Sequence, residues 1–526
     1  MSECPFRPGG GRRHSQPLTH APEVGGWRPA ARFGGLCRTA LAAGVIVVLA
    51  LGAGCGWLAA PRPLVVSFGE DTVVVDPHRG NRNVAWSVVS SYCDALVGFG
   101  PDLTLEPALA ESWERPDPTH WRFTLRRGVR FHNGAALGAA DVVASIERAR
   151  SHPASSVSYY LVGVTTVVAE GDRTVAIETS APIPDLLSRL TFVFVIPREQ
   201  AALDSVTAPV GSGSYRFVRK ERNGTIVVKA WAGWRGRPAI GDVRFEFCGS
   251  DEEAARRLVA GTTDICHHVP EDLINDLGTA TNLRLIQQPR LAVQLLGIHA
   301  ELAAGESRRA LADRRVRRAL LLALDRSSWL RRIFRGNGAV ATQYVHPAVF
   351  GFDPELEAAP YDPDAARRLL AEAGFGGGFD VVLSPGKATA EMLAAITEDL
   401  GKVGVRVHPD PALPTGPLSY FAWACSTGDA SDFLNTRLWR DDAATPLLPD
   451  AHEAQAEIAA LAAAADRETD PARRLALLQS AQRRVLDELP LLPLLVRWGY
   501  KGVSSRVEVV TRYDERESVA SFRWRR

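Results

Sequence analysis

Three short stretches of the chain carry side chains that could do chemistry. Cys266-His267-His268 places three metal-capable groups in a row, and Gly211-Ser212-Gly213 sets a serine between two glycines. Cys55 follows small residues at the end of an apolar run. The chemistry in question is metal binding for the first stretch, phosphate binding or nucleophilic attack for the second, and lipid attachment for the third. Whether any of these reactions is possible depends on the strand, turn or helix that carries the residues.

The first two stretches read as strands and turns rather than as reactive sites. Adjacent residues on a strand point to opposite faces, so Cys266-His267-His268 cannot chelate one ion together. Gly211-Ser212-Gly213 leads into a strand-like run and not into a helix with a G-K-[ST] ending, and it lacks the G-x-S-x-G frame of a serine hydrolase. We therefore predict no metal site, no cofactor and no enzymatic activity.

Length and composition describe a soluble globular body. A chain of 526 residues predicts two or three domains, and 46% apolar with 23% charged residues is ordinary for a folded protein. The 61 Lys and Arg residues are balanced by 60 Asp and Glu residues. Nucleic-acid binding needs a concentrated positive field, so we expect no nucleic-acid partner.

The N-terminus differs sharply from this body. Residues 1–38 form a basic leader rich in Gly, Pro and Arg, which we expect to be disordered, and residues 39–60 are an uncharged apolar run. Such a pair is an export signal or a membrane anchor. Cys55 after Gly52-Ala53-Gly54 resembles the lipidated Cys of a bacterial lipoprotein; an uncleaved anchor and ordinary cleavage are the alternatives. All three place the body outside the cytoplasm, in the periplasm or at the cell surface, and the first two tether it to the membrane.

Four further cysteines lie in the exported body: Cys93, Cys248, Cys266 and Cys425. They could form two disulfides in three connectivities. Cys248 and Cys266 end two strand-like runs separated by a helical stretch, as neighbouring parallel strands would, so a bridge between them is one prediction. Buried free thiols are the other.

Local patterns predict several elements of the body. Asp313 is a plausible N-cap for an apolar-striped helix ending near Leu324, with its four arginines mostly on the wet side and an extended loop after it. Asp362, Pro363 and Gly374 punctuate a second helix. Residues 243–247, 252–260 and 263–265 read as a β-α-β unit.

The order of motifs resembles a known family. The stretches RALLLALDR and YDPDAARRLLAEAGF follow PALAESW, WRFTLRRGVRFHNG and AADVVASI earlier in the chain. This series resembles the family 5 extracellular solute-binding proteins of ABC importers, which include oligopeptide-, dipeptide- and nickel-binding proteins. The resemblance extends from about residue 64 to about residue 500.

This resemblance implies an α/β, two-lobed periplasmic-binding-protein fold with an extra subdomain, a discontinuous first lobe and a hinge of crossing strands. The implied first lobe comprises residues 62–95, 206–290 and 493–526, the subdomain 96–205, and the second lobe 291–492. A ligand would be enclosed between the lobes by a hinge motion.

The resemblance also indicates where the ligand would lie. In the oligopeptide-binding protein a similar W-C-A-D-Y-N-E-P-T-S-F-L-N segment lends its backbone to an extended peptide, and its Asp holds the peptide's α-ammonium. Aligning F-L-N with residues 433–435 puts that Trp on Trp423 and that Asp on Ser426. Asp429 and Asp432 are the nearby acids that could replace it. The expected ligand-binding residues are Tyr420, Ala422, Trp423, Ala424, Cys425, Ser426 and Asp429.

The sequence thus predicts a monomeric, membrane-tethered receptor that captures a peptide or peptide-like molecule and delivers it to an ABC permease. Ser426 favours an alternative ligand class on the same fold, such as a sugar or a metal chelate. A solute sensor without a transport role is the other alternative.

Overall fold

The computed structural model describes residues 62–437 and 452–525, and residues 61–526 form one compact unit. The predicted leader and the apolar segment with Cys55 lie outside the described residues. Within the part that is described, no helix is both long enough and apolar enough to cross a membrane.

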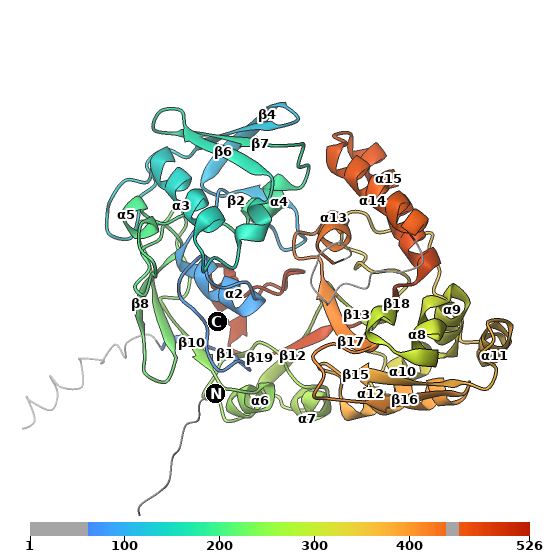
Figure 1. Ribbon diagram of the computed structural model, residues 1–526. Coiled ribbons are helices and arrows are strands. Elements are labelled where there is room, and N and C mark those ends of the chain that lie inside the picture. Colours follow the sequence, from blue (N-terminus) through green and yellow to red (C-terminus); the bar gives the residue numbers. More distant parts are fainter. Residues whose placement is uncertain (1–61, 438–451, 526) are drawn as a thin grey trace, which may run out of the picture. The chain divides into compact units, whose positions relative to one another are not determined.

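A seven-stranded mixed sheet forms the centre of what we call the first lobe (Figure 1). Its order is β12-β19-β11-β1-β10-β9-β8, with bounds β1 Leu64–Phe68, β8 Tyr215–Lys220, β9 Ile226–Ala230, β10 Asp242–Phe247, β11 Ile265–Cys266, β12 Leu283–Gln288 and β19 Gly499–Ser504. Every residue of β1 is buried, as expected for a strand with parallel neighbours on both sides. The helical elements beside this sheet are α2 Asn83–Tyr92, α6 Asp251–Val259, η2 Glu271–Leu273 and α7 Ile274–Gly278.

The predicted β-α-β unit is confirmed as β10, α6 and β11, but the two strands are not neighbours. β1 lies between them, since Val66 pairs with both Phe245 and Ile265. Cys248 and Cys266 are accordingly free thiols, as are Cys93 and Cys425. The predicted bridge between Cys248 and Cys266 is therefore wrong, because an intervening strand separates the runs that the two residues end.

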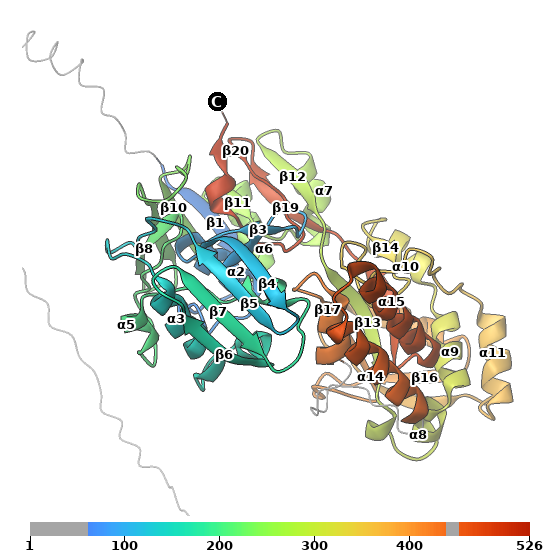
Figure 2. The same cartoon turned by 90° about the horizontal axis from the view of Figure 1, so that it is seen from above.

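An antiparallel four-stranded sheet, β4-β5-β7-β6, builds a smaller layer beside the first lobe (Figure 2). The elements between the first two parts of the large sheet are β2 Val97–Phe99, β3 Leu105–Pro107, β4 Ala110–Asp117, β5 His120–Leu125, α3 Ala139–Ser151, η1 Ser158–Leu161, β6 Val164–Ala169, β7 Thr174–Thr179, α4 Leu186–Leu190 and α5 Arg198–Ala201. A buried ion pair joins this layer to the loop after β1, because Arg148 of α3 donates to both carboxylate oxygens of Asp76 at 2.9 and 2.7 Å.

His78 beside this ion pair predicts a pH dependence of stability. Its Nδ1 accepts from Arg148 at 3.0 Å and its Nε2 donates to the carbonyl of Phe194 at 2.8 Å, so the ring is neutral. Burial lowers the pKa of His78 from 6.5 to about 4. Between these values the unfolded chain binds a proton that the folded chain does not, so acidification destabilises the fold by about 1.4 kcal/mol per pH unit.

We expect urea unfolding between pH 6.5 and 5 to show this loss in the wild type and a shallower slope in His78→Gln. The substitution also removes two hydrogen bonds, but the cost of losing them is the same at every pH and does not change the slope. Parallel pH profiles for the two proteins would contradict the assignment.

A six-stranded sheet forms the centre of the second lobe. Its order is β14-β18-β13-β17-β15-β16, with bounds β13 Ala292–Ile298, β14 Ala339–Val340, β15 Phe379–Ser384, β16 Val405–Pro409, β17 Leu418–Ala424 and β18 Leu491–Val496. The helical elements of this lobe are η3 Ala300–Leu302, α8 Gly305–Ala312, α9 Arg314–Ala323, α10 Arg326–Arg332, α11 Pro363–Glu372, α12 Ala390–Gly401, α13 Ala430–Asp432, η4 Phe433–Arg437, α14 His452–Arg467 and α15 Pro471–Glu488. Helices α9 and α11 confirm the two helices predicted from their caps.

The chain crosses between the two large sheets twice, from β12 to β13 and from β18 to β19. The boundary expected at residue 493 falls inside β18, which pairs with β13 and β14 of the second lobe. The second crossing therefore comes after Val496. The chain ends in the first lobe with β20 Val507–Glu508, η5 Val519–Ser521 and β21 Arg523–Trp524.

Candidate ligand site between the lobes

A cavity of about 500 Å³ is lined by residues from both lobes. Trp423, Ala424 and Ser426, at the end of β17 and just after it, contribute from the second lobe. The first lobe contributes mostly hydroxyl and aromatic groups. The complete lining is Asn81, Trp86, Ser155, Ser156, Ser158, Tyr159, Tyr160, Trp423, Ala424, Ser426 and Asp432. A space bounded by both lobes is one that hinge closure would seal.

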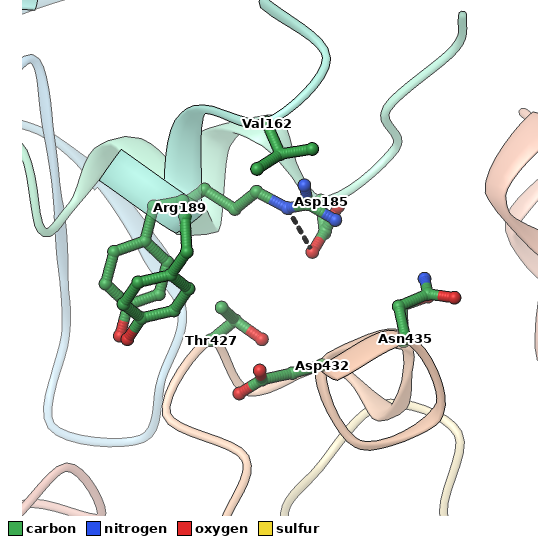
Figure 3. Close-up of a pocket in the computed structure, with 9 residues that line it drawn as sticks. Val162, Asp185, Arg189, Thr427, Asp432 and Asn435 are labelled. Carbon is green, nitrogen blue, oxygen red and sulfur yellow. Dashed lines mark hydrogen bonds and ion pairs between the residues drawn. The ribbon is translucent and has the colours of Figure 1, made fainter. Parts of the chain in front are cut away.

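A second cavity of about 230 Å³ adjoins the first, since both are lined by Tyr159, Tyr160 and Asp432. Figure 3 shows its two sides: Asp185 and Arg189 come from the start and body of α4, and Asp432 and Asn435 come from the turns of α13 and η4. Arg189 Nε lies 2.9 Å from one oxygen of Asp185. The two cavities together offer a polar end and an aromatic end.

The seven predicted ligand-binding residues separate into four groups. Trp423, Ala424 and Ser426 line the larger cavity. Tyr420 and Cys425 are buried in the hydrophobic cores of the second lobe, and burial raises the pKa of both side chains. Ala422 is exposed but lines neither of the two cavities.

Asp429, the seventh, is part of a buried ion pair. Arg474 of α15 donates to its two carboxylate oxygens at 2.6 and 2.9 Å, and the backbone N–H of Ser431 donates to one of them at 3.0 Å. The pair holds the turn that carries Ser431 and Asp432. Asp429 therefore positions the site and lines neither cavity.

Carboxylates gather around the smaller cavity from both lobes. Asp185 is buried, and its Oδ1 accepts no hydrogen bond within the described residues. Asp466 accepts from Ser431 and Asn435 at 3.0 and 2.6 Å, and burial followed by the nearby charge of Asp185 raises the pKa of Asp466. Arg189 faces the same acids, since against the effect of burial Asp185, Asp466 and Asp432 raise its pKa. Three carboxylates around this one guanidinium leave the region with net negative charge, which suits a cation.

Sequence reasoning did not find Asp185 or Asp466. They lie 247 and 34 residues from Asp432 in the sequence. The packing of the two lobes brings Asp185 to the cavity, and the packing of α14 against α13 brings Asp466 close to it. No local pattern distinguishes either residue from an ordinary helix-flanking acid.

The comparisons with known proteins show the family to which this chain belongs. Residues 104–441 match the family described as bacterial extracellular solute-binding proteins, family 5 Middle. The chain belongs to family 5. The glutathione-binding protein GsiB of Escherichia coli (strain K12) is 26% identical over 479 residues, covering 86% of this chain and 91% of that protein.

Solved structures of the same fold cover most of the chain. The dipeptide binding protein of Pseudoalteromonas sp. SM9913, in complex with Met-Leu, superposes with a TM-score of 0.75 at 21% identity, covering 88% of this chain and 100% of that one. The substrate binding protein CtaP of Listeria monocytogenes gives 0.77 at 18% identity, covering 88% and 99%. The predicted two-lobed periplasmic-binding-protein fold is confirmed.

The two stretches examined first for chemistry have structural partners in this family 5 protein. Ser212 donates to Asp94 at 3.0 Å, and His267 Nδ1 lies 2.6 Å from Glu517. Cys266 contacts the carbonyl of His268 at 3.0 Å. Among residues 62–437 and 452–525, no three His, Cys, Asp or Glu side chains are grouped to hold a metal ion.

Proposed function

We propose that this protein captures a peptide or peptide-like solute between its lobes and delivers it to an ABC permease. The observation that carries the proposal is the cavity that Trp423, Ala424 and Ser426 share with the first lobe, with acids at its polar end. GsiB is a glutathione-binding protein and the Pseudoalteromonas protein holds Met-Leu, and both ligands are peptides with a free ammonium. The role is binding without catalysis.

The position of the ammonium is different from the one that the resemblance implied. Ser426 cannot neutralise a cation, and Asp429 already serves Arg474. We infer that Asp432, which lines both cavities, takes the ammonium instead. A buried ammonium without a carboxylate partner would cost several kcal/mol, so the acids are what make a peptide acceptable here.

The peptide backbone would lie along β17. Within the described residues, β15 pairs with β17 only at Leu418 and Ser419, so Ala422 and Ala424 lie beyond that ladder. An extended peptide adding there would form main-chain hydrogen bonds whatever its sequence. Side-chain pockets would then determine which peptides bind.

The protein would work as a monomer held at the membrane through its N-terminal segment, with Cys55 as the lipidated residue. Delivery to a permease needs the receptor near the membrane but leaves both lobes free to close.

Native mass spectrometry of the full chain, purified in mild detergent without denaturation, tests the proposal. We expect complexes heavier than the apoprotein. Mild unfolding should release their ligands, and these ligands should fragment as short peptides. A single non-peptide mass would overturn the peptide assignment and support a non-peptide solute. An apoprotein that also fails to take up pooled dipeptides would overturn capture of peptides altogether.

A further inference from the structure

Arg516 is a buried arginine with unused hydrogen-bonding capacity. Its exposed fraction is 7%, and neither its Nε nor its Nη2 has a hydrogen-bond partner in the described part of the chain. The guanidinium carbon lies 5.2 Å from the ring centre of Trp86 and 4.6 Å from that of Phe192. Cation–π contact with two rings holds the group in place but satisfies none of its N–H donors.

The charge of Arg516 is also poorly compensated. Among the described residues, the carboxylate that forms an ion pair with Arg516 is Asp514, at 3.7 Å from its Nε, and Arg512 binds both oxygens of that carboxylate at 2.8 and 2.7 Å. One acid thus serves two guanidinium groups. Burial lowers the pKa of Arg516, and the charge of Arg512 adds to this lowering. A buried charge without its own partner is costly, so Arg516 lowers the stability of the fold unless another group pairs with it.

The Arg516 side chain lines a space at one end of the ligand cavity. A narrow extension of about 10 Å³, room for about one water, is lined by Arg516 together with Trp86, Ala424 and Ser426. The last three residues also line the 500 Å³ cavity, so the extension continues from it. Arg516 therefore ends the cavity on the aromatic side, whereas Asp185 lines the polar cavity next to it.

A further cavity of about 160 Å³ is also lined by Arg516, but it shares no lining residue with the 500 Å³ cavity and so is not continuous with the ligand space. It is lined by Asp94 and Glu517, whose carboxylates are paired with Arg235 and with Lys501 and His267. Acids do not distinguish this cavity from the extension, because each contains two acids that are already in ion pairs. The extension toward Ser426 contains Asp514 and Glu515, but these are held by Arg512 and by Arg290.

We propose that Arg516 binds a carboxylate of the captured solute through its Nε and Nη2 edge. These two N–H groups are parallel and match the two oxygens of a planar carboxylate. The inference rests on the proposed function and narrows it: the solute carries a cationic amine for the Asp432 end and a carboxylate for the Arg516 end. A zwitterionic peptide meets both requirements.

Pooled dipeptides in four end-group forms test this on the full chain: free, N-acetylated, C-amidated and doubly blocked. Calorimetric titration of the wild type, Arg516→Gln, Arg516→Lys and the surface control Arg406→Gln gives the affinities. Amidation should weaken binding to the wild type and to Arg406→Gln about tenfold to a hundredfold, the range for hydrogen bonds to charged groups. Amidation should not change the affinity of Arg516→Gln, and Arg516→Lys should regain part of the sensitivity to amidation.

N-acetylation should weaken binding equally in wild type and Arg516→Gln, because it acts at the other end. A merely structural Arg516 would weaken all four forms alike, and equal sensitivity to amidation in both proteins overturns the proposal. Circular dichroism checks that Arg516→Gln is folded, which we expect because the change removes an uncompensated buried charge.

If no dipeptide form binds the wild type, capture of dipeptides is wrong and Arg516 is tested separately. Sodium succinate, compared with sodium chloride at equal ionic strength, should then raise the unfolding temperature of the wild type and not of Arg516→Gln. Equal shifts in the two proteins would overturn the carboxylate site.

Discussion

The Asp432→Asn protein should bind amine-bearing dipeptides at least about 30-fold more weakly than the wild type, because truncating one partner of a buried charge pair costs about 2 kcal/mol or more. The substitution keeps the size of the side chain and removes only its charge. Asp185 still lines the cavity and Asp466 lies behind its lining residues Ser431 and Asn435, so a residual preference for amines should persist. Calorimetric titration at pH 7 with free and N-acetylated forms of one pooled dipeptide set measures the effect.

The N-acetylated form separates a charge effect from damage to the site. It has no ammonium, so it should bind wild type and Asp432→Asn with similar, weak affinity. The control is Asp364→Asn on α11, an exposed acid of the same lobe whose ion pair with Arg367 is on the surface. If Asp432→Asn weakened both peptide forms equally, the ammonium would not lie at Asp432.

Elements with local punctuation could be predicted from the sequence. Asp362 accepts from the backbone N–H of Ala365 at 2.8 Å, and Gly374 has a φ of +86°, so both ends of α11 match their caps. The four arginines of α9 were expected mostly on the wet side, and three of them are exposed. The exception, Arg317, is 2% exposed and donates to the carbonyl of Glu488 at 2.7 Å. The pattern of α9 cannot reveal a partner 171 residues away.

The stretch after α9 was also more structured than expected. An extended loop was predicted between the two helices, whereas α10 and β14 lie there. Arg326 of α10 is buried and donates to the carbonyl of Pro493 at 2.8 Å. Tertiary hydrogen bonds to another element, rather than a local apolar stripe, fix this region.

The site was predictable as a segment but not as a set of side chains. Aligning one motif placed Trp423 and Ser426 near a ligand, and both line the large cavity. Which acid replaces the family's carboxylate depends on ion pairs that form only in the fold. Asp429 was the better candidate by alignment, and its bond to Arg474 removes it from that role. Arg516 had no motif at all.

The Arg474→Met protein should lose about 3–5 kcal/mol of stability, because removing one partner of a buried ion pair leaves the other charged and uncompensated. Arg474 is 5% exposed and donates to Asp429, to Ser431 Oγ at 2.8 Å and to the carbonyl of Ala465 at 3.2 Å. Met keeps much of the side-chain volume over the ring of Phe350. Urea unfolding of the full chain, followed by circular dichroism, measures the change.

The neighbouring residue on α15 provides a matched control. The side chain of Arg473 is 72% exposed and pairs with Glu468 on the surface, so Arg473→Met should change stability by less than about 1 kcal/mol. Adding Asp429→Asn to Arg474→Met should recover most of the loss, since the amide oxygen can still accept from Ser431 while the stranded charge is gone. A double variant as unstable as Arg474→Met alone would mean that packing, and not charge, makes Arg474 necessary. The Asp429–Arg474 pair also holds the turn that carries Asp432. If the double variant is stable but binds peptides more weakly, the ion pair is needed to position Asp432 and not to stabilise the fold.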